Sequence, residues 1–308
     1  TPPTPPRYIG GMDFGAVPDP TGIDFAVPPL DPRCVARWSR PDAPFRLHTG
    51  APMWGEKAWL GTFYPENLPQ RAWLAAYAER LGAVEHNSTF YAVPTPAQVA
   101  AWAAQTPPGF RFCPKVPRTV SHAGDWRVDA PRFGEAVRAF GDRLGPVLFQ
   151  VSEDVGPEHL SEIAARVEAL GPGLRVAVEV RHPGFFPGGR LLGALLAWME
   201  RTDRIAVVTD TPGRRDVVHA SLPTRALYLR FKTADGHPVD EARTDAWVER
   251  LAAWRDAGLW EAWLFVHQRD GIGLLGRLER FHAALSARLD VPLPTRLLRP
   301  PPPRLFGG

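Results

Sequence analysis

The chain has 308 residues, of which 44% are hydrophobic and 22% are charged, and its formal net charge is +3. This is an ordinary globular composition with enough apolar material for a large core, and the dispersed Lys and Arg residues argue against a strongly basic nucleic-acid-binding surface. The two cysteines, Cys34 and Cys113, exclude a disulfide scaffold and are typical of a reducing, cytoplasmic compartment. The sequence contains no apolar run with the length of a membrane span, so no membrane partner is expected.

Both ends of the chain are rich in proline. The sequence begins TPPTPPR and ends RPPPPRLFGG, which predicts extended, solvated tails; the alternative is a contact segment for a partner protein. Residues 1–45 have no clear hydrophobic period, so we expect an irregular N-terminal arm there, followed by a domain at residues 46–290 and a Pro-rich C-terminal tail at residues 291–308.

From residue 46 onward, short apolar segments alternate with helical patterns. The expected strands begin near residues 46, 83, 111, 145, 175, 204, 226 and 262. Helical spacing of apolar residues appears in residues 70–81, 132–144, 158–170, 191–201, 240–257 and 274–289. Eight such units over about 250 residues match a single (β/α)8 TIM-barrel-like α/β domain. Because only residues 212–225 separate the sixth and seventh strands, which is short for a full helix, a doubly wound open sheet is the alternative.

The alternation of side chains along the expected strands separates an outer face from an inner face. In the segment RVAVEVR, the three valines share one face, whereas Glu179 and Arg181 share the other. Valine side chains belong under the helix layer, so Glu179 and Arg181 are expected to point toward the barrel axis.

The same argument brings polar side chains from several other strands to the same end of the barrel. They are Glu85 and Asn87 on the second strand, Lys115 on the third, Gln150 on the fourth, Asp210 on the sixth and Arg230 on the seventh. On the eighth strand, the pattern is ambiguous between His267 and Gln268. Buried charges must pair with each other or with a ligand, and sites on this fold lie at the carboxyl ends of the strands. The alternative is a sealed ion-pair network that only fills the barrel.

Lys115 and the histidines each have several candidate roles. Lys115 is expected to act as a phosphate anchor, as an ion-pair partner or as a Schiff-base amine, and the last role requires a lowered pKa. His122 and His182 closely follow strand ends, so a divalent metal site that also includes His267 and carboxylates is a candidate, although no ligand spacing specifies it.

Several of these segments resemble a known family. VEHNSTFYAVP, FRFCPKVPRTVSH, VAVEVRHPGFF and LFVHQRDG are similar to segments of the YecE-like bacterial proteins, a family named as a domain of unknown function. The resemblance covers residues 47–285 and implies a single TIM-barrel-like domain without a defined activity. Many relatives carry an asparagine-rich segment at the eighth strand, where this chain reads HQRDG. The family positions that this chain carries are Glu85, Asn87, Thr89, Tyr91, Lys115, His122, Gln150, Glu179, Arg181, His182 and Asp270.

These observations lead to two sets of candidate site residues. The catalytic set is Glu85, Glu179, Lys115 and Asp210. The substrate-binding set is Asn87, Thr89, Tyr91, His122, Gln150, Arg181, His182, Arg230, His267 and Asp270.

The first functional hypothesis is an enzyme that acts on a phosphorylated small molecule or another polyanionic substrate at the carboxyl-end rim. The guanidinium groups of Arg181 and Arg230 would hold the anion together with the amine of Lys115. Glu85 or Glu179 would act as the general base.

A metal ion extends this hypothesis, and two other functions compete with it. Asp210 and a histidine would bind a divalent ion that activates water, which gives phosphoester hydrolysis. The first competing function is a non-catalytic barrel that binds nucleic acid or a nucleotide through arginines and loop aromatic rings. The second is a structural barrel that contacts partner proteins through its proline-rich tails.

Overall fold

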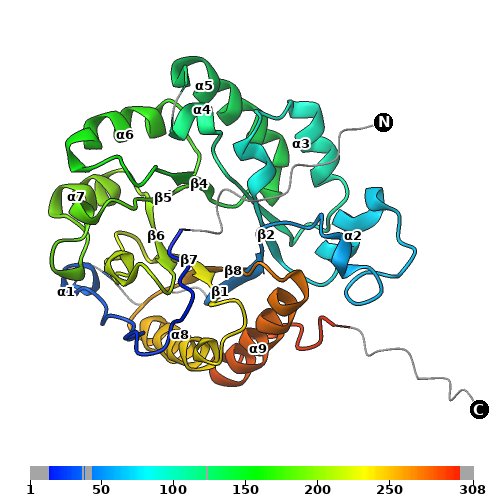
Figure 1. Cartoon of the computed structure of the whole chain (residues 1–308). Coiled ribbons are helices and arrows are strands. Elements are labelled where there is room, and N and C mark those ends of the chain that lie inside the picture. Colours follow the sequence, from blue (N-terminus) through cyan, green and yellow to red (C-terminus); the bar gives the residue numbers. More distant parts are fainter. Residues whose placement is uncertain (1–13, 37, 39–43, 123, 299–308) are drawn as a thin grey trace, which may run out of the picture.

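The computed structural model describes residues 14–36, 38, 44–122 and 124–298. Eight parallel strands surround a central axis and helices cover them on the outside (Figure 1). The strands are β1 (Arg46–Ala51), β2 (Ala83–His86), β3 (Arg111–Pro114), β4 (Val147–Gln150), β5 (Val176–Glu179), β6 (Ile205–Asp210), β7 (Ala226–Lys232) and β8 (Glu261–His267).

The strand order closes the sheet into a barrel. Neighbouring strands follow the order β3-β2-β1-β8-β7-β6-β5-β4, so that the first strand of the barrel pairs with the last one. Between β3 and β4 the pairing consists of isolated bridges, including Lys115 with Leu148, and the N–H of Val116 donates to the carbonyl of Leu148 at 2.9 Å. The TIM-barrel-like fold is therefore confirmed, and the doubly wound alternative is wrong.

The described helices largely follow the predicted periodicity. They are α1 (Pro32–Val35), α2 (Trp73–Ala78), α3 (Pro96–Ala103), α4 (Arg118–Ser121), α5 (Trp126–Val137), α6 (Leu160–Glu168), α7 (Gly193–Arg201), α8 (Val239–Asp256) and α9 (Gly271–Leu289). The short 3-10 helices are η1 (Lys57–Trp59), η2 (Gln70–Ala72), η3 (Asn87–Phe90), η4 (Arg138–Arg143), η5 (Pro157–His159), η6 (Pro183–Phe185), η7 (Pro187–Gly189) and η8 (Arg215–Val217). The β6–β7 connection, which is described throughout, holds only η8, and this explains the short sixth interval in the sequence.

The interior of the barrel changes from apolar to polar along each strand. A layer of apolar side chains fills the axis, and it consists of Ala83, Cys113, Leu148, Ala177, Ile205, Val207, Ala226, Tyr228, Trp263 and Phe265. Two residues after six of these positions, toward the carboxyl end, the same inner face carries Glu85, Lys115, Gln150, Glu179, Arg230 and His267. The valines of β5 belong instead to the larger core beneath the helices, as the alternation predicts.

The N-terminal arm crosses the carboxyl end of the barrel before the first strand begins. The carbonyl of Gly15 accepts from the N–H of Gly213 at 2.7 Å, and the N–H of Asp31 donates to Ala220 at 2.9 Å. In Figure 1 the dark blue segment passes over β6 and β7 and reaches α1 at the outside. The extreme proline-rich ends, residues 1–13 and 299–308, lie outside the described residues.

Two further expectations from the sequence concern the membrane and the cysteines. Among the described residues, no helix combines the length and the apolar character needed to cross a membrane. Cys34 and Cys113 are buried free thiols, and burial raises the pKa of Cys34 to about 12.

Candidate functional site

Arg230 of β7 joins two carboxylates at the barrel axis. Its Nε and Nη2 donate to the two carboxylate oxygens of Glu85, both at 2.9 Å, and its Nη1 donates to Glu179 Oε2 at 2.8 Å. A second guanidinium, that of Arg181, donates through Nε to Glu179 Oε1 at 2.7 Å. Glu85, Glu179 and Arg230 are each at most 2% exposed, so these charges satisfy one another inside the barrel.

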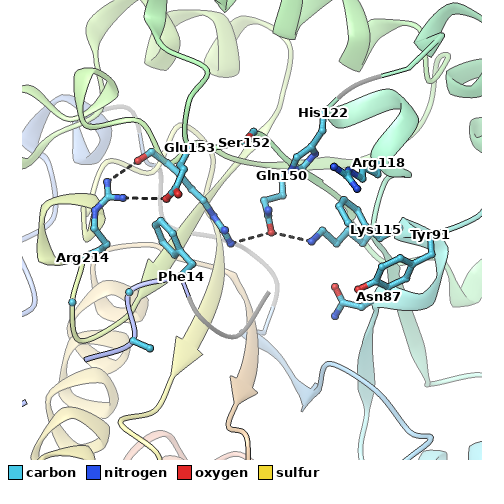
Figure 2. Close-up of a pocket in the computed structure, with 15 residues that line it drawn as sticks. Phe14, Asn87, Tyr91, Lys115, Arg118, His122, Gln150, Ser152, Glu153 and Arg214 are labelled. Carbon is cyan, nitrogen blue, oxygen red and sulfur yellow. Dashed lines mark hydrogen bonds and ion pairs between the residues drawn. The ribbon is translucent and has the colours of Figure 1, made fainter. Parts of the chain in front are cut away.

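Gln150 of β4 links this buried network to solvent. Its Oε1 accepts from Lys115 Nζ and from Arg181 Nη2, each at 3.0 Å, and lies 3.4 Å from Arg230 Nη1. Three cationic donors therefore converge on one neutral oxygen, and Figure 2 shows Gln150 between Lys115 and the side of the cavity that carries Phe14.

Both glutamates are held in the ionised form. Burial opposes ionisation of Glu85, but Arg230 and His267 outweigh it and hold the pKa of Glu85 well below its usual range. Burial acts in the same direction on Glu179, and Arg181 and Arg230 nevertheless lower its pKa to about 2. At neutral pH these carboxylates are paired anions with little tendency to accept a proton.

Lys115 is the cation that this network leaves without a carboxylate partner of its own. Two guanidinium groups already balance the two glutamates, and the amine of Lys115 donates to the Gln150 amide and lies 4.1 Å above the ring of Phe90. Burial, followed by the charges of Arg230 and Arg181, lowers the pKa of Lys115 to about 7 in spite of both glutamates. A large fraction of this amine is therefore neutral at physiological pH.

A cavity of about 760 Å³ opens above Lys115 and Gln150. It lies at the carboxyl ends of the strands, and its remaining walls come from η3, α4, the β4 and β6 loops and the arm. Figure 2 shows Phe14 on one side of the cavity, and Lys115, Arg118 and Tyr91 on the other. The full lining is Phe14, Gly15, Ala16, Asn87, Phe90, Tyr91, Lys115, Arg118, His122, Gln150, Ser152, Glu153, Arg181, Gly213 and Arg214.

Phe14 fixes the arm against the cationic side of the cavity. The guanidinium of Arg181 lies 4.0 Å from the centre of the Phe14 ring, and that of Arg214 lies at 5.1 Å. The carbonyl of Phe14 accepts from Lys232 Nζ and from Thr211 Oγ1. Cation–π contacts and hydrogen bonds thus make the arm part of the cavity wall.

Asp210 does not reach this site, so the expectation that it points toward the barrel axis is wrong. Its carboxylate faces α8, where Oδ1 accepts from Arg243 Nη2 at 2.8 Å and Oδ2 accepts from the indole N–H of Trp247. Arg215 of η8 is its third partner. Both faces of β6 are apolar in the sequence, so alternation alone did not show that Thr209 takes the inner position and Asp210 the outer one.

Three other candidate residues support loops and lie outside the cavity lining. The Nδ1 of His182 accepts from the N–H of Gly184 at 3.1 Å, and Asp270 caps α9 by accepting from Ile272 and Gly273. Thr89 is buried and its hydroxyl donates to the carbonyl oxygens of His86 and Lys115, so it fixes the backbone at Lys115.

The ambiguity on β8 is resolved in favour of His267. Its Nε2 lies 3.3 Å from Glu85 Oε1, and burial lowers its pKa even though Glu85 acts in the opposite direction. His122 lines the cavity, where burial and then Lys115 and Arg181 lower its pKa to about 4. Burial thus disfavours the charged form of both imidazoles.

The residues at the site do not fit a divalent metal ion. Glu85 and Glu179 are engaged by guanidinium groups, and Asp210 faces away. Within the described part of the chain, no group of three or more His, Cys, Asp or Glu side chains is placed to hold a metal together. The donor set thus lacks the free carboxylates that such an ion needs.

The structure adds several lining residues that sequence reasoning missed. Phe14 comes from the arm and Arg118 from the start of α4, whereas Glu153 and Arg214 come from the loops after β4 and β6. Strand alternation makes no prediction for any of these positions. In the sequence, only the RTVSH segment after β3 pointed to Arg118, because it places Arg118 about one helical turn before the candidate His122.

Comparisons with known proteins agree with this architecture. The model of the family described as "Protein of unknown function DUF72" matches residues 48–300. The UPF0759 protein YecE of Escherichia coli (strain K12) is 27% identical over 245 residues, which cover 73% of this chain and 87% of that protein. The YecE protein of Escherichia coli O157:H7 matches to the same extent.

Two solved structures share the fold. A DUF72 family protein from Enterococcus faecalis V583 superimposes with a TM-score of 0.64 at 16% identity, over 80% of this chain and 99% of that one. A DUF72 family protein from Thermotoga maritima MSB8 gives a TM-score of 0.58 at 20% identity, over 76% of this chain and 98% of that one.

Replacing Arg230 tests whether the buried network holds the barrel mouth together. We expect Arg230→Met to lower the free energy of unfolding by about 4 kcal/mol, because two buried carboxylates lose their shared partner. Urea unfolding followed by circular dichroism measures this effect, with Arg71→Met as the control because Arg71 is exposed and does not line the cavity. Equal stability of the two variants would contradict the assigned role of Arg230.

Proposed function

We propose that this chain, which belongs to the DUF72 family of proteins of unknown function, is an enzyme that acts on a small phosphorylated or otherwise polyanionic molecule at the barrel mouth. The observation that carries the proposal is a deprotonatable amine, Lys115, at the base of an open cavity with arginines around it.

The charges around the cavity favour an anionic ligand. Its lining includes the cationic side chains of Lys115, Arg118, Arg181 and Arg214 but only one carboxylate, that of Glu153. Arginine forks match phosphate oxygens, and a partly buried site strengthens each such contact. Arg181 is paired with Glu179 and Arg214 with Asp216, so the positive charge that favours an anion comes mainly from Arg118 and from the protonated form of Lys115.

We assign proton transfer to Lys115 rather than to a glutamate. A general base works best with a pKa near the ambient pH, and the pKa of Lys115 is about 7, whereas that of Glu179 is about 2. In this proposal Glu85, Glu179 and Arg230 are positioning residues. Burial and then Arg230 lower the pKa of the amine in spite of the two glutamates, which hold the Arg230 guanidinium in place.

Nucleotide or single-stranded nucleic-acid binding is the second candidate, and Tyr91 is the observation that favours it. Its ring is 55% exposed and lines both the main cavity and an adjoining one of about 640 Å³, and Arg118 also lines both. An exposed aromatic ring beside arginine is a stacking surface for a base.

Arg118 tests anion binding, because it is exposed and lines the cavity. We expect Arg118→Gln to weaken binding of inorganic phosphate or glycerol 3-phosphate about tenfold in calorimetric titration, since a charge-assisted contact contributes about 1.5 kcal/mol. Arg71→Gln is the matched control and should bind like the wild type. Unchanged affinity in both variants would remove Arg118 from the anion site.

The protonation of Lys115 is measurable from its reactivity. Raising the pH through about 7 removes the proton, so we expect acetylation of Lys115 by trace acetic anhydride to rise with a midpoint near pH 7. Bound phosphate should move this midpoint upward, because an anion stabilises the ammonium form. Peptide mass spectrometry reads each lysine separately, with exposed Lys57 as the internal reference. A midpoint near the ordinary lysine value of about 10.4 would contradict the assignment.

Tyr91→Ala separates the two candidate functions. If nucleic acid binds here, removing the ring should weaken binding of a fluorescent oligothymidylate about tenfold, and affinity should fall steeply as salt rises. Binding that does not change with salt or with the substitution would count against the second candidate and leave the first one intact.

A further inference from the structure

The chain contains only three lysines, Lys57, Lys115 and Lys232, among its 36 lysine and arginine residues. Arginine remains protonated under all physiological conditions, whereas lysine is able to lose its proton and react as an amine. Lys57 is exposed on η1, but Lys115 and Lys232 are buried at the carboxyl ends of β3 and β7. Most cationic residues of this chain are arginines, yet two of its three lysines lie at the barrel mouth. Burial there lowers the pKa of a lysine, whereas an arginine would stay protonated.

The two buried lysines are not equivalent. Lys232 donates to the carbonyl of Phe14 and lies against the Phe14 ring, so it holds the arm. Lys115 lines the main cavity, and its amine contacts the amide oxygen of Gln150 and the face of Phe90. Of the two, only the Lys115 side chain lines that cavity.

The polar groups around Lys115 suit a hydroxylated ligand. Asn87 is 3% exposed and lines the cavity, and its Nδ2 donates to Glu85 Oε1 at 2.9 Å. Its Oδ1 has no hydrogen-bond partner among the described residues. Because a buried amide oxygen normally accepts a hydrogen bond, this atom indicates a hydroxyl donor on the ligand. Arg118 at the rim suits its phosphate group, and Arg214, which is also paired with Asp216, lies across the cavity from it (Figure 2).

We propose that Lys115 forms an imine with the carbonyl carbon of a hydroxylated aldehyde or ketone phosphate, of the sugar-phosphate class. This inference rests on the proposed function and specifies its substrate. The neutral amine adds to the carbonyl carbon, and one of its two N–H protons passes to the carbonyl oxygen to give a carbinolamine. That oxygen takes a second proton from solvent in the open cavity and leaves as water, while the nitrogen lone pair completes the C=N bond of a protonated imine.

The surroundings of Lys115 favour this reaction at two points. Before attack, burial and then Arg230 and Arg181 disfavour the ammonium form of Lys115, which would not be nucleophilic. After dehydration, the protonated imine carries the same single charge as the lysine ammonium group. It therefore keeps the cation–π contact with the ring of Phe90.

Reductive trapping on the full-length protein tests the imine. The protein is incubated with glyceraldehyde 3-phosphate and sodium cyanoborohydride, which delivers hydride to the C=N bond and leaves a stable secondary amine. Intact mass and peptide mapping should show one adduct per chain, located at Lys115, with Lys57 and Lys232 labelled at least tenfold more slowly. Glyceraldehyde without the phosphate should label Lys115 at least tenfold more slowly, because it lacks the group that the arginines hold.

Variants and a non-carbonyl ligand separate the possible failures. Lys115→Arg should abolish the adduct, and Lys57→Arg, at an exposed residue away from the cavity, should keep it. If Lys115 variants do not fold, as judged by thermal unfolding, the site of labelling in the wild-type protein still decides the question. Labelling that is faster at Lys57, or absent at Lys115 while glycerol 3-phosphate binds, would overturn the imine and leave the proposed function standing. Absence of both labelling and glycerol 3-phosphate binding would overturn both.

Discussion

The arrangement of the barrel mouth depends on Arg230, whose guanidinium joins Glu85 of β2 to Glu179 of β5 across the axis. Two ionised carboxylates in a region without solvent would repel each other and lose hydration, and one planar fork with hydrogen bonds to both removes much of this cost. Apolar side chains of similar volume would fill the same space without charge. The main effect of the network is therefore on Gln150, Arg181 and Lys115: it positions these side chains and influences the pKa of Lys115.

The N-terminal arm gives the cavity its shape. Without Phe14 and Gly15, the carboxyl ends of β6 and β7 would face solvent, and Arg181 would lose the ring that lies against its guanidinium. Contacts of Phe14 with both Arg181 and Lys232 couple the position of the arm to the charges of the site. A segment outside the repeating strand–helix pattern thus supplies a wall that the barrel itself lacks.

The sequence predicted the positions that follow strand periodicity and missed those that depend on packing. Glu179, Arg181 and Arg230 face the inside because valine or leucine residues mark the outer face of their strands. The same reasoning failed for Asp210, because its side chain turns outward to pair with Arg243 on α8, which is distant in the sequence. Helix α3 also went unpredicted, although Thr95, Pro96 and Gln98 form a capping box with proline at the helix start. Phe14 gave no signal, because an arm without periodicity has no predictable inner face.

The charge balance at the mouth also links ligand binding to protonation. Two guanidiniums and two carboxylates cancel, so the protonation of Lys115 sets the local charge at the base of the cavity. An anion there favours the ammonium form, and by linkage the ammonium form binds the anion more tightly by the same factor. In the proposed imine reaction the amine must be neutral for attack, so the reaction would be favoured if the anionic group of the substrate binds at the rim, beside Arg118 and Arg214, rather than at the base. Arg118 at the start of α4 and Arg214 in the loop after β6 line the cavity from segments beyond the strands, whereas Lys115 directly follows β3.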